Sequence, residues 1–79
     1  MIFLIEYDRA SGSIVTMNAF DNSERQKAED SRLELELEHN RRGIEREVVL
    51  LEAETEDALR RTHRRYFEDL TELAMAPAN

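Results

Sequence analysis

Ile2-Phe3-Leu4-Ile5-Glu6-Tyr7 is the stretch that decides the fold, because its β-branched and aromatic residues favour a strand at the start of the chain. Successive side chains of a strand point to opposite faces, so Ile2 and Leu4 lie on one face while Phe3 and Ile5 lie on the other. Both faces of the sheet that contains this strand are therefore apolar. Each face needs a covering layer, from this chain or from another copy.

A second strand is predicted at residues 14–20, after a loop that begins at Asp8. The Asp8 carboxylate can accept a hydrogen bond from the nearby backbone, and Gly12 supplies a positive φ angle, so the loop closes a turn. Two strands joined by so short a loop pair as an antiparallel hairpin. A third strand is predicted at residues 47–53, where a continuous apolar run indicates burial on both faces.

A first helix is predicted from about residue 23 to residue 41. Asp21 or Ser23 opens it as an N-cap, and Gly43 ends it in a left-handed cap. Within this helix, residues 33–38 alternate Leu and Glu with the period of a half-buried strand, which stays open as an alternative. Helix is favoured because both residue types form helices well, Glu is depleted in strands, and no turn precedes the stretch.

A last helix is predicted to begin at the N-cap Thr55, with Glu56 and Asp57 in its first turn, where the helix dipole favours acidic side chains. Its apolar stripe recurs at helical spacing and consists of Leu59, Thr62, Tyr66, Leu70 and Leu73. Pro77 marks its end, so we expect one domain at residues 1–76 and a frayed tail at residues 77–79.

The element order β-β-α-β-α predicts the α+β class, with one sheet and two helices. A right-handed crossover from the second strand places the third beside the first, which gives a three-stranded antiparallel sheet in the order 2-1-3. This element order resembles the small N-terminal hybrid-binding domain found on some ribonucleases H. The resemblance rests on element order alone. The chain has no tryptophan and its first helix is acidic, so no residue is carried over.

The first helix is apolar on two sides. At about 100° per residue, Leu33 and Leu37 lie about 40° apart, whereas Leu35 lies about 200° from Leu33 and groups with Ala28 and Ser31. Either one helix covers each sheet face in a closed monomer, or both helices cover one face and a second copy covers the other. Edge strands joined into a six-stranded sheet are a third possibility. The two-sided helix and the small chain favour a homodimer with twofold symmetry.

The composition limits the class of function. The chain has 79 residues and no cysteine, and the lack of cysteine excludes disulfides and thiolate metal sites. Its net charge of −7 disfavours indiscriminate binding to phosphate backbones. The apolar run at the N-terminus is too short for a signal peptide, and no stretch is long enough for a membrane span. We therefore expect a complete cytoplasmic chain with no cofactor, no metal and no membrane contact.

Arginines form the sharpest local feature, and the candidate patch consists of Arg41, Arg42, Arg46, Arg60, Arg61, Arg64 and Arg65. The last four make a strip on one side of the last helix, and the first three surround the turn before the third strand. Brought together in space, they would bind phosphate or an acidic partner, because the planar guanidinium pairs two oxygens at once. The alternative is a solvated face, since acidic residues lie four positions before and after the strip, namely Glu56, Asp57, Glu68 and Asp69.

Neither histidine predicts catalysis. His63 lies at the edge of the apolar stripe and is expected to be half-buried, and His39 lies where a protonated imidazole complements the end of the first helix. No nucleophile with an adjacent base, no calcium loop and no phosphate-cradling loop is present. We therefore expect a non-catalytic protein-interaction module that acts as a homodimer. A nucleic-acid-binding domain that uses the arginine patch is the alternative.

Overall fold

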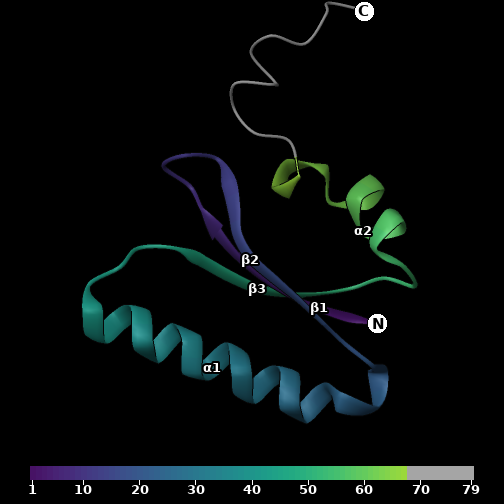
Figure 1. Cartoon of the computed structure of the whole chain (residues 1–79), viewed down its shortest axis with the longest axis horizontal. Coiled ribbons are helices and arrows are strands. Elements are labelled where there is room, and N and C mark those ends of the chain that lie inside the picture. Colours follow the sequence, from purple (N-terminus) through teal and green to yellow (C-terminus); the bar gives the residue numbers. More distant parts are fainter. Residues whose placement is uncertain (68–79) are drawn as a thin grey trace, which may run out of the picture.

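The structure of the chain, a computed structural model, describes residues 1–67 (Figure 1). Its strands are β1 (Ile2–Asp8), β2 (Ser13–Phe20) and β3 (Glu47–Glu52), and its helices are α1 (Arg25–Arg42) and α2 (Glu56–Thr62). Two short 3₁₀ turns, η1 (Asn22–Glu24) and η2 (Arg64–Tyr66), precede α1 and follow α2. The α+β class and the order β-β-α-β-α are confirmed.

The sheet has the strand order β2-β1-β3, and both pairs are antiparallel, as predicted. In the centre of the sheet, Ile5 lies opposite Met17 on one side and Val49 on the other. The β1–β2 register shifts after Glu6, which leaves Val15 as the extra residue of a bulge. β1 is the middle strand, and all its residues from Ile2 to Tyr7 are buried.

One helix covers each face of the sheet, with α1 on one side and α2 on the other (Figure 1). Phe3, Ile5 and Tyr7 of β1 form a core with Leu59 of α2 and Tyr66 of η2. The opposite face of β1 turns toward α1. This is the closed arrangement, and the alternative in which both helices share one face is wrong. A homodimer therefore needs a surface other than a bare sheet face.

The Leu-Glu stretch at residues 33–38 is helical, as predicted, and it lies in the middle of α1. Leu35 is half-buried on the sheet side of the helix, whereas Leu33 and Leu37 are 54% and 58% exposed on its outer side. Gly43 ends the helix with a φ angle of 67°, which confirms the left-handed cap. The two-sided pattern thus consists of one packed side and one exposed side.

α2 begins as predicted, because the Thr55 hydroxyl accepts a hydrogen bond from the Ala58 N–H at 3.1 Å. It ends at Thr62, so the prediction of one continuous last helix is wrong within the described residues. His63 leaves the helical region with φ −123° and ψ 51°, and η2 then turns Tyr66 onto Tyr7. The two rings meet edge to face with centroids 5.1 Å apart, a favourable aromatic geometry that a straight helix would not reach.

Leu70, Leu73 and the expected tail at residues 77–79 lie outside the described residues. No helix within residues 1–67 combines the length and the apolar character that crossing a membrane requires.

Candidate functional site

A charged cluster lies inside the molecule, between α1 and the sheet. Its centre is Glu6 of β1, which is only 4% exposed. His39, from the last turn of α1, lies over it with 3.0 Å between His39 Nε2 and Glu6 Oε2. Arg46 donates to the same carboxylate oxygen at 2.5 Å, and Thr16 of β2 donates to Glu6 Oε1 at 3.1 Å. We call these four residues the Glu6 cluster.

Both oxygens of the Glu6 carboxylate are therefore hydrogen-bonded, which is what a buried charge requires. Burial raises the pKa of Glu6, but the hydrogen bonds from Arg46 and Thr16, together with the Coulombic effects of His39 and Arg46, outweigh burial and hold the pKa below its usual value. Glu6 is thus a charged carboxylate in the folded protein at neutral pH. It links three elements, because Thr16 comes from β2, His39 from α1, and Arg46 from the loop before β3.

The Glu6 carboxylate also places a proton on one nitrogen of the His39 ring. A carboxylate only accepts hydrogen bonds, so His39 Nε2 is the donor in this contact. His39 Nδ1 is buried and has no hydrogen-bond partner among the described residues. Buried polar atoms are nearly always paired, so this unpaired ring nitrogen is an exception in the structure.

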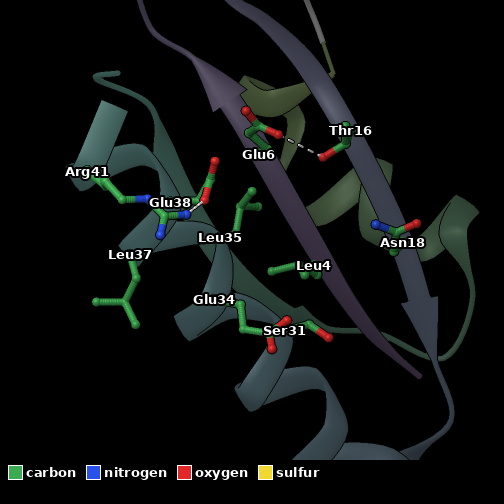
Figure 2. A pocket seen from close by; sticks show the side chains of 10 residues that line it. All are labelled: Leu4, Glu6, Thr16, Asn18, Ser31, Glu34, Leu35, Leu37, Glu38 and Arg41. Atoms are coloured by element: carbon green, nitrogen blue, oxygen red, sulfur yellow. Dashed lines mark hydrogen bonds and ion pairs between the residues drawn. The ribbon is translucent and has the colours of Figure 1, made fainter. Parts of the chain in front are cut away.

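Two hollows lie on either side of the Glu6 cluster. The first is a groove of about 680 Å³ between α1 and β2, where Leu4 and Leu35 face each other and Thr16 and Asn18 form part of the floor (Figure 2). The second is a pocket of about 500 Å³ at the C-terminal end of α1, and His39 is part of its wall. Glu6 lines the groove and His39 lines the pocket, so the contact between their side chains separates the two.

The seven predicted arginines do not form one patch within the described residues. Three of them lie at the end of α1 and in the loop that follows, and the other four lie on α2 and η2, on the opposite face of the sheet (Figure 1). Their partners are carboxylates: Glu38 for Arg41 and Arg42, Glu6 for Arg46, Glu56 for Arg60, Asp57 for Arg61, and Glu47 for Arg65. Arg64 is also engaged. Glu68 and Asp69 lie outside the described residues.

Glu47, at the start of β3, organises a second set of polar contacts that sequence reasoning missed. Its Oε1 accepts hydrogen bonds from Arg65 at 2.7 Å and from the Tyr66 hydroxyl at 3.1 Å, and it lies 3.6 Å from Arg9 of the hairpin loop. The Arg65 guanidinium also lies over the Tyr66 ring at 4.3 Å. These contacts fasten η2 and the hairpin loop to the sheet, which is a structural role.

Sequence reasoning also missed Glu6 as a site residue. The signal was present, because a single carboxylate inside a strand that is apolar on both faces needs a buried partner. The sequence did not reveal which residue is that partner, because Arg46 is separated from Glu6 by 40 positions. His39 was expected to complement the helix dipole, and its main contact is instead the Glu6 carboxylate.

The lowered pKa of Glu6 predicts acid sensitivity. The folded carboxylate binds a proton more weakly than the unfolded one, whose pKa is 4.5. Glu6 therefore adds stability above that pH, and this contribution disappears as the pH falls through the folded pKa. In urea unfolding between pH 7 and pH 3, we expect Glu6→Gln to be less stable than the wild type at pH 7. The variant should also lose less stability toward pH 3. Equally steep losses in both proteins would contradict this role.

Within residues 1–67, no group of three or more histidine, aspartate or glutamate side chains is arranged to hold a metal ion. The polar groups at this site are the buried Glu6 carboxylate, both oxygens of which are hydrogen-bonded, and His39 Nδ1, which has no hydrogen-bond partner among the described residues. Comparison of the chain with protein families, with curated proteins and with solved structures finds no match.

Proposed function

We propose that this chain is a non-catalytic, cytoplasmic interaction module that forms a homodimer through the outer edge of β2. The observation that carries the proposal is the composition of this strand. β2 has eight residues, and none of them is charged, in a chain of which 37% of residues are charged. Within the described residues β2 pairs with β1 alone, so the backbone groups along its outer edge are available to another strand.

Edge strands of natural proteins are usually protected by charged side chains, by proline or by bulges. β2 carries no charge and no proline, and the uncharged run continues from Ala10 to Phe20. Its bulge at Val15 lies near one end, which leaves residues 16–20 regular. β3, the other edge strand, begins and ends with the charged residues Glu47 and Glu52. β2 is thus the less protected of the two edges.

A second copy of this chain is the occupant that the charge distribution favours. Two copies with a net charge of −7 each repel one another over most of their surfaces. An uncharged strand is a place where they can meet without bringing like charges together. Antiparallel pairing of two β2 strands about a twofold axis would give a six-stranded sheet, which is the third arrangement considered from the sequence.

A pair of matched variants tests this dimer. Asn18→Glu places a carboxylate on β2, and Asn40→Glu makes the same change on the exposed side of α1. By light scattering after size exclusion, we expect the wild type at twice the chain mass of 9.3 kDa. Like charges across a strand pair are destabilising, so Asn18→Glu should raise the dimer dissociation constant about tenfold or more. Asn40→Glu should leave it within about twofold.

A wild type that stays monomeric at millimolar concentration would overturn the proposal. The reverse pattern, in which Asn40→Glu dissociates the dimer and Asn18→Glu does not, would also overturn it, because it would place the contact on the outer side of α1 near Leu33 and Leu37. Circular dichroism of both variants checks that each remains folded.

A further inference from the structure

The outer edge of β3 is the second open edge of the sheet. Within residues 1–67, β3 pairs with β1 alone, and α1 and α2 lie over the two faces of the sheet (Figure 1). A strand at an edge presents unpaired backbone groups to which another strand can bond. β2 and β3 form opposite edges, so a contact at β3 is separate from the proposed dimer contact.

The hydrogen bonds between β1 and β3 show which backbone groups of β3 face outward. The Met1 N-terminus donates to the Ala53 carbonyl at 2.9 Å, and the Ala53 N–H donates to the Met1 carbonyl at 3.1 Å. In an antiparallel pair, such doubly bonded positions alternate with positions whose backbone groups point away from the partner strand. The register of the pair has no shift, so the outward-facing groups belong to Val48, Leu50 and Glu52. No residue in the described part of the chain hydrogen-bonds to them.

The apolar side chains of β3 are also incompletely covered. They are half-buried, whereas all residues of β1 from Ile2 to Tyr7 are buried. Both strands lie between α1 and α2, so the difference follows from the neighbours in the sheet, two for β1 and one for β3 (Figure 1). An added strand would remove more of this apolar surface from water on both faces. The side chains concerned are Val48, Val49, Leu50 and Leu51.

The charge at the two ends of β3 decides which kind of strand fits. Residues 45–54 contain four glutamates and a single arginine. The two inner glutamates have arginine partners. The two outer ones, Glu45 and Glu54, are exposed and make no hydrogen bond or ion pair with any residue between positions 1 and 67. Uncompensated negative charge therefore flanks the open edge at both ends.

This charge disfavours a second copy of the chain at the β3 edge. Antiparallel pairing of two whole β3 strands about a twofold axis would bring Glu47 of one copy opposite Glu52 of the other. Like charges directly opposite each other destabilise a strand pair, whereas opposite charges stabilise it. Charge complementarity thus favours a different strand, with basic residues at both ends.

We propose that the outer edge of β3 binds an extended segment of another protein, with apolar residues in its centre and lysine or arginine at each end. The segment adds as a fourth strand, and its backbone bonds to the outward-facing groups of Val48, Leu50 and Glu52. Its basic ends pair with Glu45 and Glu54. These two glutamates are nine positions apart, about 30 Å along an extended chain, so the segment has about ten residues.

The probe is an acetylated and amidated peptide in which four Thr-Val repeats lie between two lysines. Amide hydrogen exchange of the full chain is followed by NMR with and without the peptide. At saturating peptide, we expect the amides of Val48, Leu50 and Glu52 to exchange about tenfold more slowly or less, because each becomes part of a strand pair.

The outer edge of β2 is the internal control. β1 turns alternate residues toward its two neighbours, so Met17 and Ala19 are the outward-facing residues in the regular part of β2. Their exchange should not change on addition of the peptide. Slower exchange at Met17 and Ala19 without slower exchange on β3 would overturn the proposal, because it would place the peptide on the other edge.

Two altered peptides separate the two parts of the recognition. A peptide with glutamate in place of both lysines keeps the backbone donors and reverses the charge, and it should bind about tenfold more weakly or worse. A peptide with N-methyl groups on its Thr and Val nitrogens keeps the charge and loses the donors, and we again expect a loss of about tenfold or more. Equal binding of the original and either altered peptide would contradict strand addition guided by charge.

A charge-reversed double variant tests the site on the protein. Glu45→Lys combined with Glu54→Lys should weaken binding of the original peptide about tenfold or more, since both flanking charges are reversed. Glu29→Lys combined with Glu34→Lys is the matched control, because both residues are exposed on α1 and the net charge changes equally. The control should stay within about twofold of the wild type. Equal losses in the two double variants would mean that the peptide responds only to net charge.

Absence of saturable binding at millimolar peptide would also overturn the proposal. Slow exchange of the Val48, Leu50 and Glu52 amides in the free protein would do the same, because the edge would then already be occupied. Asn18→Glu should bind the peptide as the wild type does, so this proposal and the dimer can fail separately.

Discussion

Replacing Leu59 with alanine is expected to destabilise the protein by about 3 kcal/mol, within the range found for leucines in closed cores. Leu59 is 0% exposed and is the buried residue of α2. It packs in the core formed by Phe3, Ile5 and Tyr7 of β1, so its removal leaves a cavity beneath a seven-residue helix that has little stability of its own. The loss is a large part of the roughly 4–12 kcal/mol expected for a domain of this size.

Urea unfolding followed by circular dichroism measures this change, and Leu37→Ala is the matched control. Leu37 is 58% exposed on α1, so the same substitution there should change the free energy of unfolding by about 0.5 kcal/mol or less. Equal losses in the two variants would mean that Leu59 does not hold α2 on the sheet.

Replacing Glu6 with leucine is expected to cost about 3–5 kcal/mol, because the substitution removes one partner of a buried ion pair and strands the others. Arg46 is partly exposed and can turn toward water, with 32% of its side chain accessible. His39 cannot do so, because 9% of its side chain is accessible, and both of its ring nitrogens would then lack a partner. The expected result is a protein near its unfolding threshold at room temperature.

The triple variant Glu6→Leu, His39→Leu, Arg46→Leu separates the effect of a stranded partner from that of lost volume. Apolar replacement of a complete buried charge network is often neutral or stabilising. The triple variant should therefore recover at least half of the stability lost in the single variant, as measured by the urea midpoint. A triple variant that is less stable than Glu6→Leu would show that the Glu6 cluster itself stabilises the fold.

Features that depend on local chemistry were predictable from the sequence. The caps at Thr55 and Gly43 follow from one hydroxyl and one positive φ angle, and both occur where expected. The strand order follows from the handedness of one crossover, and the buried central strand from its own apolar run. Each of these rules uses neighbours in the chain or a single geometric constraint.

Features that depend on which surfaces meet were not predictable. Sequence spacing predicted that Arg60 and Arg64 lie on one strip. It could not predict how far this strip lies from Arg41, which is on the other side of the sheet. The helical spacing of apolar residues predicted that the last helix continues past Thr62. In the structure the helix ends there, and a tight turn brings Tyr66 into contact with Tyr7. The partners of Glu6 depend on how α1 crosses the sheet, which no local pattern encodes.

The central position of β1 has a consequence for synthesis on the ribosome. β1 is made first, yet its two neighbours arrive at different times, β2 directly and β3 only after α1 has been made. Until residue 52 has emerged, the nascent hairpin holds an apolar strand with one open edge, and a hairpin alone is marginally stable. The sheet is therefore completed only after β3 has been made, and a nascent chain that stops before β3 would be prone to aggregate.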